Sequence, residues 1–325
     1  MMPSQFCPVC RGLESVTLET IDLGELHAFY APRDLPMQRK LTDEAKKSAD
    51  SYRMLKCRNC ELEFADPLVS PSAQWYELSY PLLEAYPSDR WEFQQVLSAL
   101  RSSDRLFEIG TGSGSFLRQC RKRGIKAAGC DFSPDAVQQC RDSGLSATVL
   151  DIAKFRGEET ADAPRYDAIA SFHVLEHLPD PHSLFMLAAS IAAPEANLWL
   201  AVPSSRRPSR VLGDRDFLDQ PPHHMTRWSE PALEKVAERH SWKLAETRFE
   251  PMPFGTAVWW RTRLHPFYRR LVTPSTGRLF EKFARTLLYP ALALKVLTSK
   301  RLSGLTMLAR YVKAQPTLDA HFRRP

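Results

Sequence analysis

Four cysteines near the start of the chain form two pairs, each with two residues between its members. The pairs are Cys7 with Cys10 and Cys57 with Cys60, and 46 residues separate them. Two intervening residues let both thiolates of a pair point at one ion, and four thiolates complete the closed tetrahedral site of a structural Zn²⁺. Free buried thiols and two redox dithiols are the alternatives, but the double pair is more specific than either. The sequence therefore predicts a zinc site.

A glycine-rich run in the middle of the chain has the character of a cofactor loop. Gly110, Gly112 and Gly114 alternate with small residues, starting two positions after Glu108. A nicotinamide site needs glycine amides against a pyrophosphate in a Gly-x-Gly-x-x-Gly run, but Ser115 stands at the last position here. A carboxylate beside the loop suits a ligand that has a cationic ammonium group and no phosphate. S-adenosylmethionine has both properties.

Two further acids stand at the ends of predicted strands. Asp131, at the end of the strand that follows the glycine run, is placed to accept hydrogen bonds from ribose hydroxyls, and Asp151 is placed to take the adenine amino group. Each acid alone could simply cap a helix. Together with Glu108, they predict one crevice at the carboxyl ends of three strands. We expect the next residues, Phe132 and Ile152, to contact the cofactor as well.

The elements that must position these acids alternate between strands and helices. The predicted strands are residues 105–109, 125–130, 147–150, 166–171 and 197–202, and the predicted helices among them are 115–123, 134–142 and 181–192. Pro134 and Pro181 stand where helices begin, and Gly124 and Gly144 stand where helices stop. This alternation predicts an α/β fold with a parallel sheet covered on both faces.

Three motifs in this region resemble those of class I S-adenosylmethionine-dependent methyltransferases. Residues 107–116 are similar to the first glycine motif, residues 129–133 to the acidic loop after the second strand, and residues 166–181 to the motif after the fourth strand. The resemblance covers residues 88–250 and, with the cysteine pairs, extends to the subgroup with an N-terminal zinc ribbon. It implies a Rossmann-like sheet, and it implies that Phe172 and His173 line the pocket for the methionine end of the cofactor.

Two histidine clusters could supply the base that a hydroxyl acceptor needs in methyl transfer. Glu176 and His177 follow His173, but we favour a helix start with local hydrogen bonds as the explanation of these two residues. His223 and His224 lie in a segment similar to the Tyr…Glu-His region of sugar C-methyltransferases, with proline at the tyrosine position. That departure favours O-methylation, with His224 as general base and His223 supporting it. The pair could also bind a metal, but the sequence shows no third ligand.

The chain ends in a strongly basic segment. Residues 251–325 carry a net charge of +12, and residues 1–250 carry −6. Arg261, Arg263, Arg269 and Arg270 lie among aromatic residues at helical spacing, which predicts amphipathic helices that hold an anionic acceptor or touch a lipid surface. A helical cap with solvated cations is the alternative. Nucleic acid is disfavoured as a partner because the segment has no recognisable binding module.

These patterns together predict a methyltransferase of four parts. They are a zinc ribbon (1–66), a connector or flap (67–87), an S-adenosylmethionine-binding domain (88–250) and a mostly helical basic extension (251–325). We expect the protein in the cytoplasm, with peripheral membrane contact as an option, because it lacks a secretion signal and any apolar run of membrane-spanning length. The expected acceptor is a hydroxyl of a sugar, glycolipid or small metabolite. The rivals are an RNA methyltransferase, a catalytically silent binding module and a nicotinamide dehydrogenase.

Overall fold

The chain forms two compact units in the computed structural model, which describes residues 6–82, 89–157, 165–213, 216–263, 294 and 302–314. The larger unit comprises Met1–Val202, Phe217–Arg248 and Leu308–Pro325, and the smaller unit comprises Pro203–Asp216 and Phe249–Met307. The cysteine region and the α/β region belong to the same unit. The division into four parts stays a prediction.

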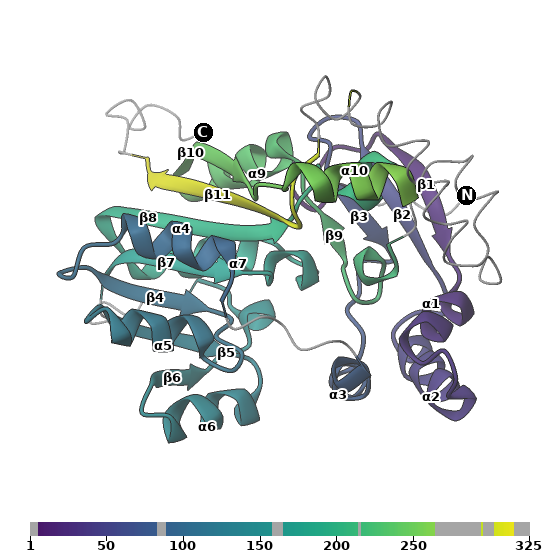
Figure 1. Cartoon of the computed structure of the whole chain (residues 1–325), viewed down its shortest axis with the longest axis horizontal. Coiled ribbons are helices and arrows are strands. Elements are labelled where there is room, and N and C mark those ends of the chain that lie inside the picture. Colours follow the sequence, from purple (N-terminus) through teal and green to yellow (C-terminus); the bar gives the residue numbers. More distant parts are fainter. Residues whose placement is uncertain are drawn as a thin grey trace, which may run out of the picture. The chain divides into compact units, whose positions relative to one another are not determined.

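A seven-stranded sheet organises the larger unit, with strand order β10-β11-β8-β7-β4-β5-β6. The strands are β4 (Arg105–Ile109), β5 (Lys126–Asp131), β6 (Ser146–Val149), β7 (Tyr166–Phe172), β8 (Ala192–Pro203), β10 (Trp242–Phe249) and β11 (Thr306–Lys313). Strands β8, β7, β4, β5 and β6 are parallel to their neighbours, so their carboxyl ends meet at one edge (Figure 1). The predicted α/β fold is confirmed.

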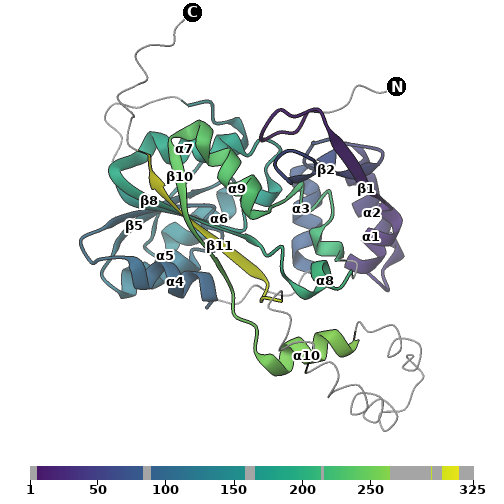
Figure 2. The same ribbon diagram turned by 90° about the horizontal axis from the view of Figure 1, so that it is seen from above.

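Helices cover both faces of this sheet, as Figure 2 shows for α4 and α5 on one side and α7 and α9 on the other. They are α4 (Trp91–Ala99), α5 (Ser115–Lys122), α6 (Pro134–Asp142), α7 (His182–Ile191) and α9 (Glu230–Ala237). On the first face, Phe93 of α4 and Phe116 of α5 share a core with the strands. On the other, Phe185 of α7 packs edge-on against Tyr311 of β11, with ring centroids 5.5 Å apart.

Helix boundaries follow local signals in the sequence. Ser133 caps α6 by accepting a hydrogen bond from the N–H of Ala136 at 3.3 Å, and Ser229 caps α9 in the same way. Gly124 and Gly144 follow α5 and α6 with φ angles of 73° and 70°, a left-handed conformation that glycine adopts without steric cost. Within the described ranges, the single-turn 3₁₀ helices are η1 (Tyr80–Leu82), η2 (Ile152–Lys154), η3 (Leu175–His177), η4 (Phe217–Asp219) and η5 (Glu238–His240).

A second sheet, of order β1-β2-β3-β9, lies in the cysteine region. Its strands are β1 (Ser15–Ile21), β2 (Tyr52–Cys57), β3 (Glu63–Asp66) and β9 (Thr226–Arg227). Helices α1 (Leu23–Tyr30) and α2 (Leu35–Lys46) fill the long interval between the cysteine pairs, and α3 (Ala73–Ser79) lies in the predicted connector. Strand β9 comes from far along the chain and directly follows His223 and His224. Its pairing with β3 therefore anchors the histidine segment to the N-terminal sheet.

A buried arginine holds this anchor in place. Arg227 of β9 lies opposite Glu63 in the β3–β9 register, and their side chains approach to 3.4 Å. The same guanidinium lies 2.9 Å from a carboxylate oxygen of Glu19 and 3.0 Å from one of Asp219. These three carboxylates raise the pKa of Arg227 although burial alone would lower it. The strand pair is therefore stabilised by a charge network with one cation among three acids.

The C-terminal segment differs from the predicted helical extension. Helix α10 (Phe254–Arg263) is present, but β11 is a strand of the main sheet between β10 and β8. Its residues Met307, Leu308, Ala309 and Tyr311 are all buried, so the strand lacks the alternation that identifies a half-exposed strand. Arg261 is only 9% exposed, which contradicts a solvated cationic face at that position. Arg269, Arg270 and the helix expected at 277–288 lie outside the described residues.

Polar contacts organise the smaller unit around a short helix, α8 (Pro208–Val211). The Nε of Arg207 lies 3.2 Å from Oδ2 of Asp216, and Oε2 of Glu250 accepts hydrogen bonds from the backbone N–H groups of Leu305 and Thr306. Among the described helices of both units, none is long and apolar enough to cross a membrane.

Candidate functional site

The glycine loop leaves β4 at the carboxyl edge of the main sheet. Gly110 has a φ of 83°, and a Cβ there would lie 2.3 Å from Cγ2 of Val174, so only glycine fits. Gly112 has a φ of 47°, and no atom lies within 4 Å of the place a Cβ would take. The loop therefore presents backbone to open space there. Gly114 then leads into α5.

Glu108 occupies the end of β4 just before this loop. Its side chain is 3% exposed, and Oε2 has no hydrogen-bond partner among the described residues. Burial raises the pKa of Glu108 well above its ordinary value, the Asp131 carboxylate raises it further, and Arg90 opposes both. A cationic group that entered beside Glu108 would relieve this cost, since an opposite charge favours the ionised carboxylate. The ammonium group of S-adenosylmethionine fits that requirement.

Asp131 ends β5 and joins two loops of the same edge. Its Oδ2 accepts a hydrogen bond from the N–H of Gly112 at 2.8 Å, and its Oδ1 accepts one from the N–H of Ser133 at 3.0 Å. Each carboxylate oxygen keeps acceptor capacity for a ligand hydroxyl. The next residue, Phe132, is 52% exposed, which leaves an aromatic ring available at the loop surface. The structure thus brings Glu108, the glycines and Asp131 to one edge.

Asp151 follows β6 at the same edge and has local partners. Its Oδ1 accepts a hydrogen bond from the N–H of Ala153 at 3.1 Å, and Lys154 lies 2.9 Å from its other oxygen. The carboxylate therefore caps η2, which is the alternative role that the sequence left open. Ile152 is 5% exposed, so most of its side chain is packed in the protein. The adenine contact predicted for these two residues stays a prediction.

Phe172 and His173, which were predicted to line one pocket together, have different surroundings in the structure. The ring of Phe172 packs against Phe93 and Phe116, with centroids 4.8 and 4.7 Å apart, so its side chain belongs to the core rather than to a pocket wall. His173 instead lies between two buried carboxylates, each 3.3 Å away: Glu92 at Nε2 and Glu176 at Nδ1. β7 ends at Phe172, and the left-handed backbone of His173 directs the next side chain away from the path of the strand.

The pair of carboxylates controls the charge of His173. Burial alone would lower the pKa of this imidazole, but the hydrogen bonds to Glu176 and Glu92 raise it to about 9. Its backbone has a φ of 56°, a left-handed conformation that is uncommon outside glycine and asparagine. A strained residue held by two buried acids at a strand end is a feature that typically marks a functional site. Glu92, on α4, carried no signal in the sequence.

The two predicted histidine clusters form one cluster in the structure. The ring centroids of His177 and His224 are 4.8 Å apart, those of His223 and His224 are 4.7 Å apart, and those of His177 and His223 are 5.2 Å apart. One nitrogen of each imidazole lies within 4.8 Å of the others. Burial lowers the pKa of His177 to about 4 and that of His223 well below its ordinary value. The expectation that the His223–His224 pair lacks a third neighbouring ligand is wrong.

Each imidazole of the histidine cluster uses its Nδ1 for a hydrogen bond to a group other than the two neighbouring rings. Nδ1 of His177 lies 2.7 Å from the carbonyl oxygen of His223, and Nδ1 of His224 lies 3.1 Å from Oδ1 of Asp219. Nδ1 of His223 bonds to the hydroxyl of Tyr30. Tyr30 was missed because it lies 193 residues from its partner, and Asp219, five residues before His224, was missed because it belongs to no recognisable motif.

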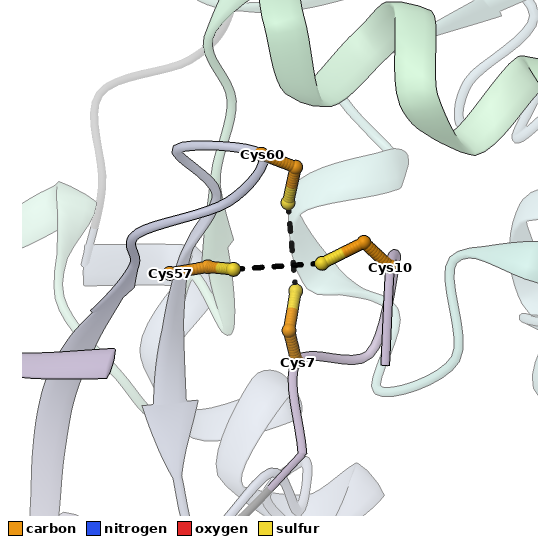
Figure 3. A group of neighbouring side chains, drawn as sticks. All are labelled: Cys7, Cys10, Cys57 and Cys60. Atoms are coloured by element: carbon orange, nitrogen blue, oxygen red, sulfur yellow. Dashed lines mark hydrogen bonds between the residues drawn. The ribbon is translucent and has the colours of Figure 1, made fainter. Parts of the chain in front are cut away.

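The four predicted cysteine ligands also meet, as Figure 3 shows. Sγ of Cys7 lies 3.5 Å from that of Cys60, and Sγ of Cys10 lies 3.5 Å from that of Cys57. Backbone N–H groups of Gly12 and Asn59 point at two of the sulfurs, at 3.4 Å each. Four sulfurs about one Zn²⁺ at 2.3 Å would be roughly 3.8 Å apart, so the observed spacing fits a tetrahedral thiolate site.

The comparisons with known proteins agree with this geometry. Residues 88–247 match the family described as "Methyltransferase domain". The chain carries an S-adenosylmethionine-dependent methyltransferase domain. That domain holds Glu108, the glycine loop, Asp131 and His173, while the cysteine site and Tyr30 precede it.

The individual relatives are distant from this chain. It is 27% identical over 165 residues to a ubiquinone biosynthesis O-methyltransferase of Hahella chejuensis, covering 49% of this chain and 68% of that protein. It is 33% identical over 111 residues to the protein of that name in Alkalilimnicola ehrlichii, covering 33% and 44%. A solved S-adenosylmethionine-dependent methyltransferase of Archaeoglobus fulgidus is 16% identical with a TM-score of 0.45, covering 68% of this chain and 90% of that one.

Proposed function

We propose that this methyltransferase transfers a methyl group from S-adenosylmethionine to a hydroxyl oxygen of a small molecule. The observation that carries the proposal is the histidine cluster at the carboxyl edge of the sheet, next to the motif that follows β7. The relatives named as O-methyltransferases support a hydroxyl acceptor. Because the alignments to the first five relatives cover 44% to 68% of their own length, the acceptor is proposed only as a class: a hydroxyl on an aromatic metabolite, a sugar or a glycolipid.

The chain's own residues have distinct roles in this proposal. S-adenosylmethionine, when bound, supplies a methyl group activated by its positively charged sulfur. Glu108 holds the ammonium group of the cofactor, and Asp131 accepts hydrogen bonds from its ribose. Alignment of donor and acceptor does most of the remaining work in such a displacement. His173 lies where it can position the methionine end from between its two carboxylates.

The acceptor hydroxyl must lose a proton, and we assign that step to the histidine cluster. The sequence predicted His224 as general base with His223 in support; in the structure the ring of His177 joins them. The hydrogen bond from Nδ1 of His224 to Asp219 fixes the tautomer, which leaves Nε2 with the lone pair. This arrangement supports a role for the cluster in ionising the acceptor.

We propose that the four cysteines bind a zinc ion with a structural role. Four thiolates leave no open coordination position, so a zinc ion there would stabilise the fold rather than act in chemistry. His182 of α7 hydrogen-bonds to the carbonyl oxygen of Pro8, between Cys7 and Cys10, at 2.9 Å. We propose that the zinc site holds this knuckle against the methyltransferase domain.

The basic C-terminal segment keeps its proposed role in attracting an anionic acceptor or a lipid surface. Most of its cations lie outside the described residues, so the proposal rests on the charge of +12 carried by residues 251–325. Cytoplasmic localisation likewise stays a prediction.

Methyl transfer can be tested directly with S-adenosylmethionine labelled on its methyl group. We expect label to enter at least one member of a panel of catechols, phenolic acids and nucleotide sugars, with one S-adenosylhomocysteine formed per methyl transferred. His224→Ala should reduce turnover by about 10²–10⁴-fold with cofactor affinity retained. His240→Ala is the matched control, because His240 is paired with His182 outside the cluster. Label that entered RNA, or a nitrogen or carbon atom, would overturn the O-methylation proposal.

A further inference from the structure

The histidine cluster has the composition and geometry of a metal site. His177 ends η3, and His223 and His224 are adjacent residues 46 and 47 positions later, yet one nitrogen of each lies within 4.8 Å of the other two. An ion bound at the usual zinc–nitrogen distance holds its nitrogen ligands roughly 3.3 Å apart, so small ring rotations close the remaining gap. We infer that His177, His223 and His224 together bind one divalent transition-metal ion.

Hydrogen bonds at Nδ1 of each ring prepare the rings for this role. A carbonyl oxygen and a carboxylate oxygen can only accept, so His177 and His224 carry their protons on Nδ1 and keep the lone pair on Nε2. Nδ1 of His223 bonds to the hydroxyl of Tyr30, which can accept as well as donate, so a proton on Nδ1 and a ligating Nε2 are compatible with this contact. A ligating histidine commonly donates its other N–H to a carboxylate, carbonyl or similar group, which fixes the tautomer and orients the ring. His177 and His224 meet that pattern, and the hydroxyl of Tyr30 can serve His223 in the same way.

The supporting partners are themselves fixed by packing. Asp219 is 3% exposed and lies 3.0 Å from Nε of Arg227, which binds it to the β3–β9 anchor. Tyr30 is 4% exposed and packs edge-on against Trp75, with ring centroids 5.8 Å apart. The imidazoles therefore lie on a rigid frame built from the N-terminal sheet and its helices. Such a frame is what a preformed metal site requires.

The ligand set differs from that of the cysteine site. Three neutral imidazoles leave a fourth position open, as in catalytic zinc sites, whereas four thiolates close a structural site. The inference rests on the proposed function and changes one step of it: a hydroxyl bound at the open position would have a lowered pKa and release its proton to solvent water. The metal would then ionise the acceptor, and Nε2 of His224 would serve as a ligand in place of the general-base role assigned above. Metal binding itself does not depend on any acceptor.

The test counts zinc and identifies its ligands in the full-length protein. After dialysis against Zn²⁺ and removal of the excess, the metal is measured per chain, and X-ray absorption at the zinc edge reports sulfur and nitrogen ligands. We expect two zinc ions in wild type with mixed ligation, and one zinc with sulfur ligation alone in His177→Gln and in His224→Gln. The control His240→Gln should keep two. Tyr30→Phe should weaken the nitrogen-ligated site by about 10–100-fold, since it removes an outer hydrogen bond.

The number of zinc ions and their ligands show which of the two proposed sites, the histidine site or the cysteine site, fails to bind metal. One zinc with sulfur ligation alone in wild type would overturn the inference, and that result needs no variant to fold. Two zinc ions retained in both histidine variants would also overturn it. One zinc with nitrogen ligation alone would support the histidine site and refute zinc at the cysteines. Because no measurement uses turnover, failure of the O-methylation proposal would leave this result unaffected.

Discussion

His27 makes the stability of the N-terminal region depend on pH, and the structure predicts the size of the effect. Its side chain is fully buried, and its Nε2 accepts a hydrogen bond from Nε1–H of Trp75 at 3.2 Å. Its Nδ1 lies 2.9 Å from Oγ1 of Thr42, whose own proton goes to the carbonyl oxygen of Gln38. The neutral ring is therefore satisfied at both nitrogens. Protonation would place a second N–H against that of Trp75.

The direction of the effect follows from the two pKa values. Burial lowers the pKa of His27 from 6.5 to about 4 in the folded protein. Between these values the unfolded chain binds more protons than the folded chain, so the free energy of unfolding falls as the pH falls from 6.5 towards 4. At 1.36 kcal/mol per pKa unit, the loss at pH 4.5 amounts to about 2–3 kcal/mol.

The assay compares wild type with His27→Gln, whose amide can accept from Trp75 and donate to Thr42 without titrating. Urea unfolding would be followed by tryptophan fluorescence and circular dichroism at pH 7.5, 5.5 and 4.5. The other buried histidines and the cysteine site titrate in both proteins, so the difference between them isolates His27. We expect wild type to lose about 2–3 kcal/mol more than the variant between pH 7.5 and 4.5. Equal losses would refute the reasoning.

Three further substitutions test other parts of the structure. Asp131→Ala should weaken S-adenosylmethionine binding by about 1–3 kcal/mol in calorimetry, because ribose and the Gly112 N–H lose an acceptor, whereas Asp135→Ala, on the exposed side of α6, should not. Cys57→Ser should lose its zinc in elemental analysis and lower the melting temperature, since the site contributes folding free energy; a fully stable metal-free variant would contradict this. Arg227→Met should cost about 3 kcal/mol in urea unfolding, since buried carboxylates lose their cation; no change would show that the network is not stabilising.

The parts of the site that depend on local sequence patterns could be predicted from the sequence alone. The glycine run, the acids at strand ends and the paired cysteines each sit within a few residues of the element that positions them. Their positions therefore followed from strand and helix signals alone. Most strand and helix boundaries predicted within residues 88–250 agree with the structure to within two residues because the helix caps and stops, such as Ser133 and Gly144, are also local. Strand β8 begins five residues earlier than predicted, and β10 was not predicted.

Features that depend on distant contacts were not predictable in this way. The third imidazole comes from a motif that was interpreted separately in the sequence. The two segments meet because the N–H of Met225 donates to the carbonyl oxygen of Glu176 at 2.8 Å, a contact that no sequence pattern indicates. Tyr30 and Asp219 act through partners that have no regular spacing in the sequence. Strand β11 was missed because it is apolar on both faces and follows a basic segment, so neither alternation nor context marked it as part of the sheet.

Calorimetric titration with S-adenosylmethionine tests the central claim most directly, which is that Glu108, the glycine loop and Asp131 form the cofactor site. We predict one cofactor bound per chain, no comparable binding of a nicotinamide dinucleotide, and at least tenfold weaker binding in Glu108→Gln, since a neutral amide cannot pair with the ammonium group. Preferential binding of the dinucleotide, or unchanged affinity for S-adenosylmethionine in folded Glu108→Gln, would contradict the account.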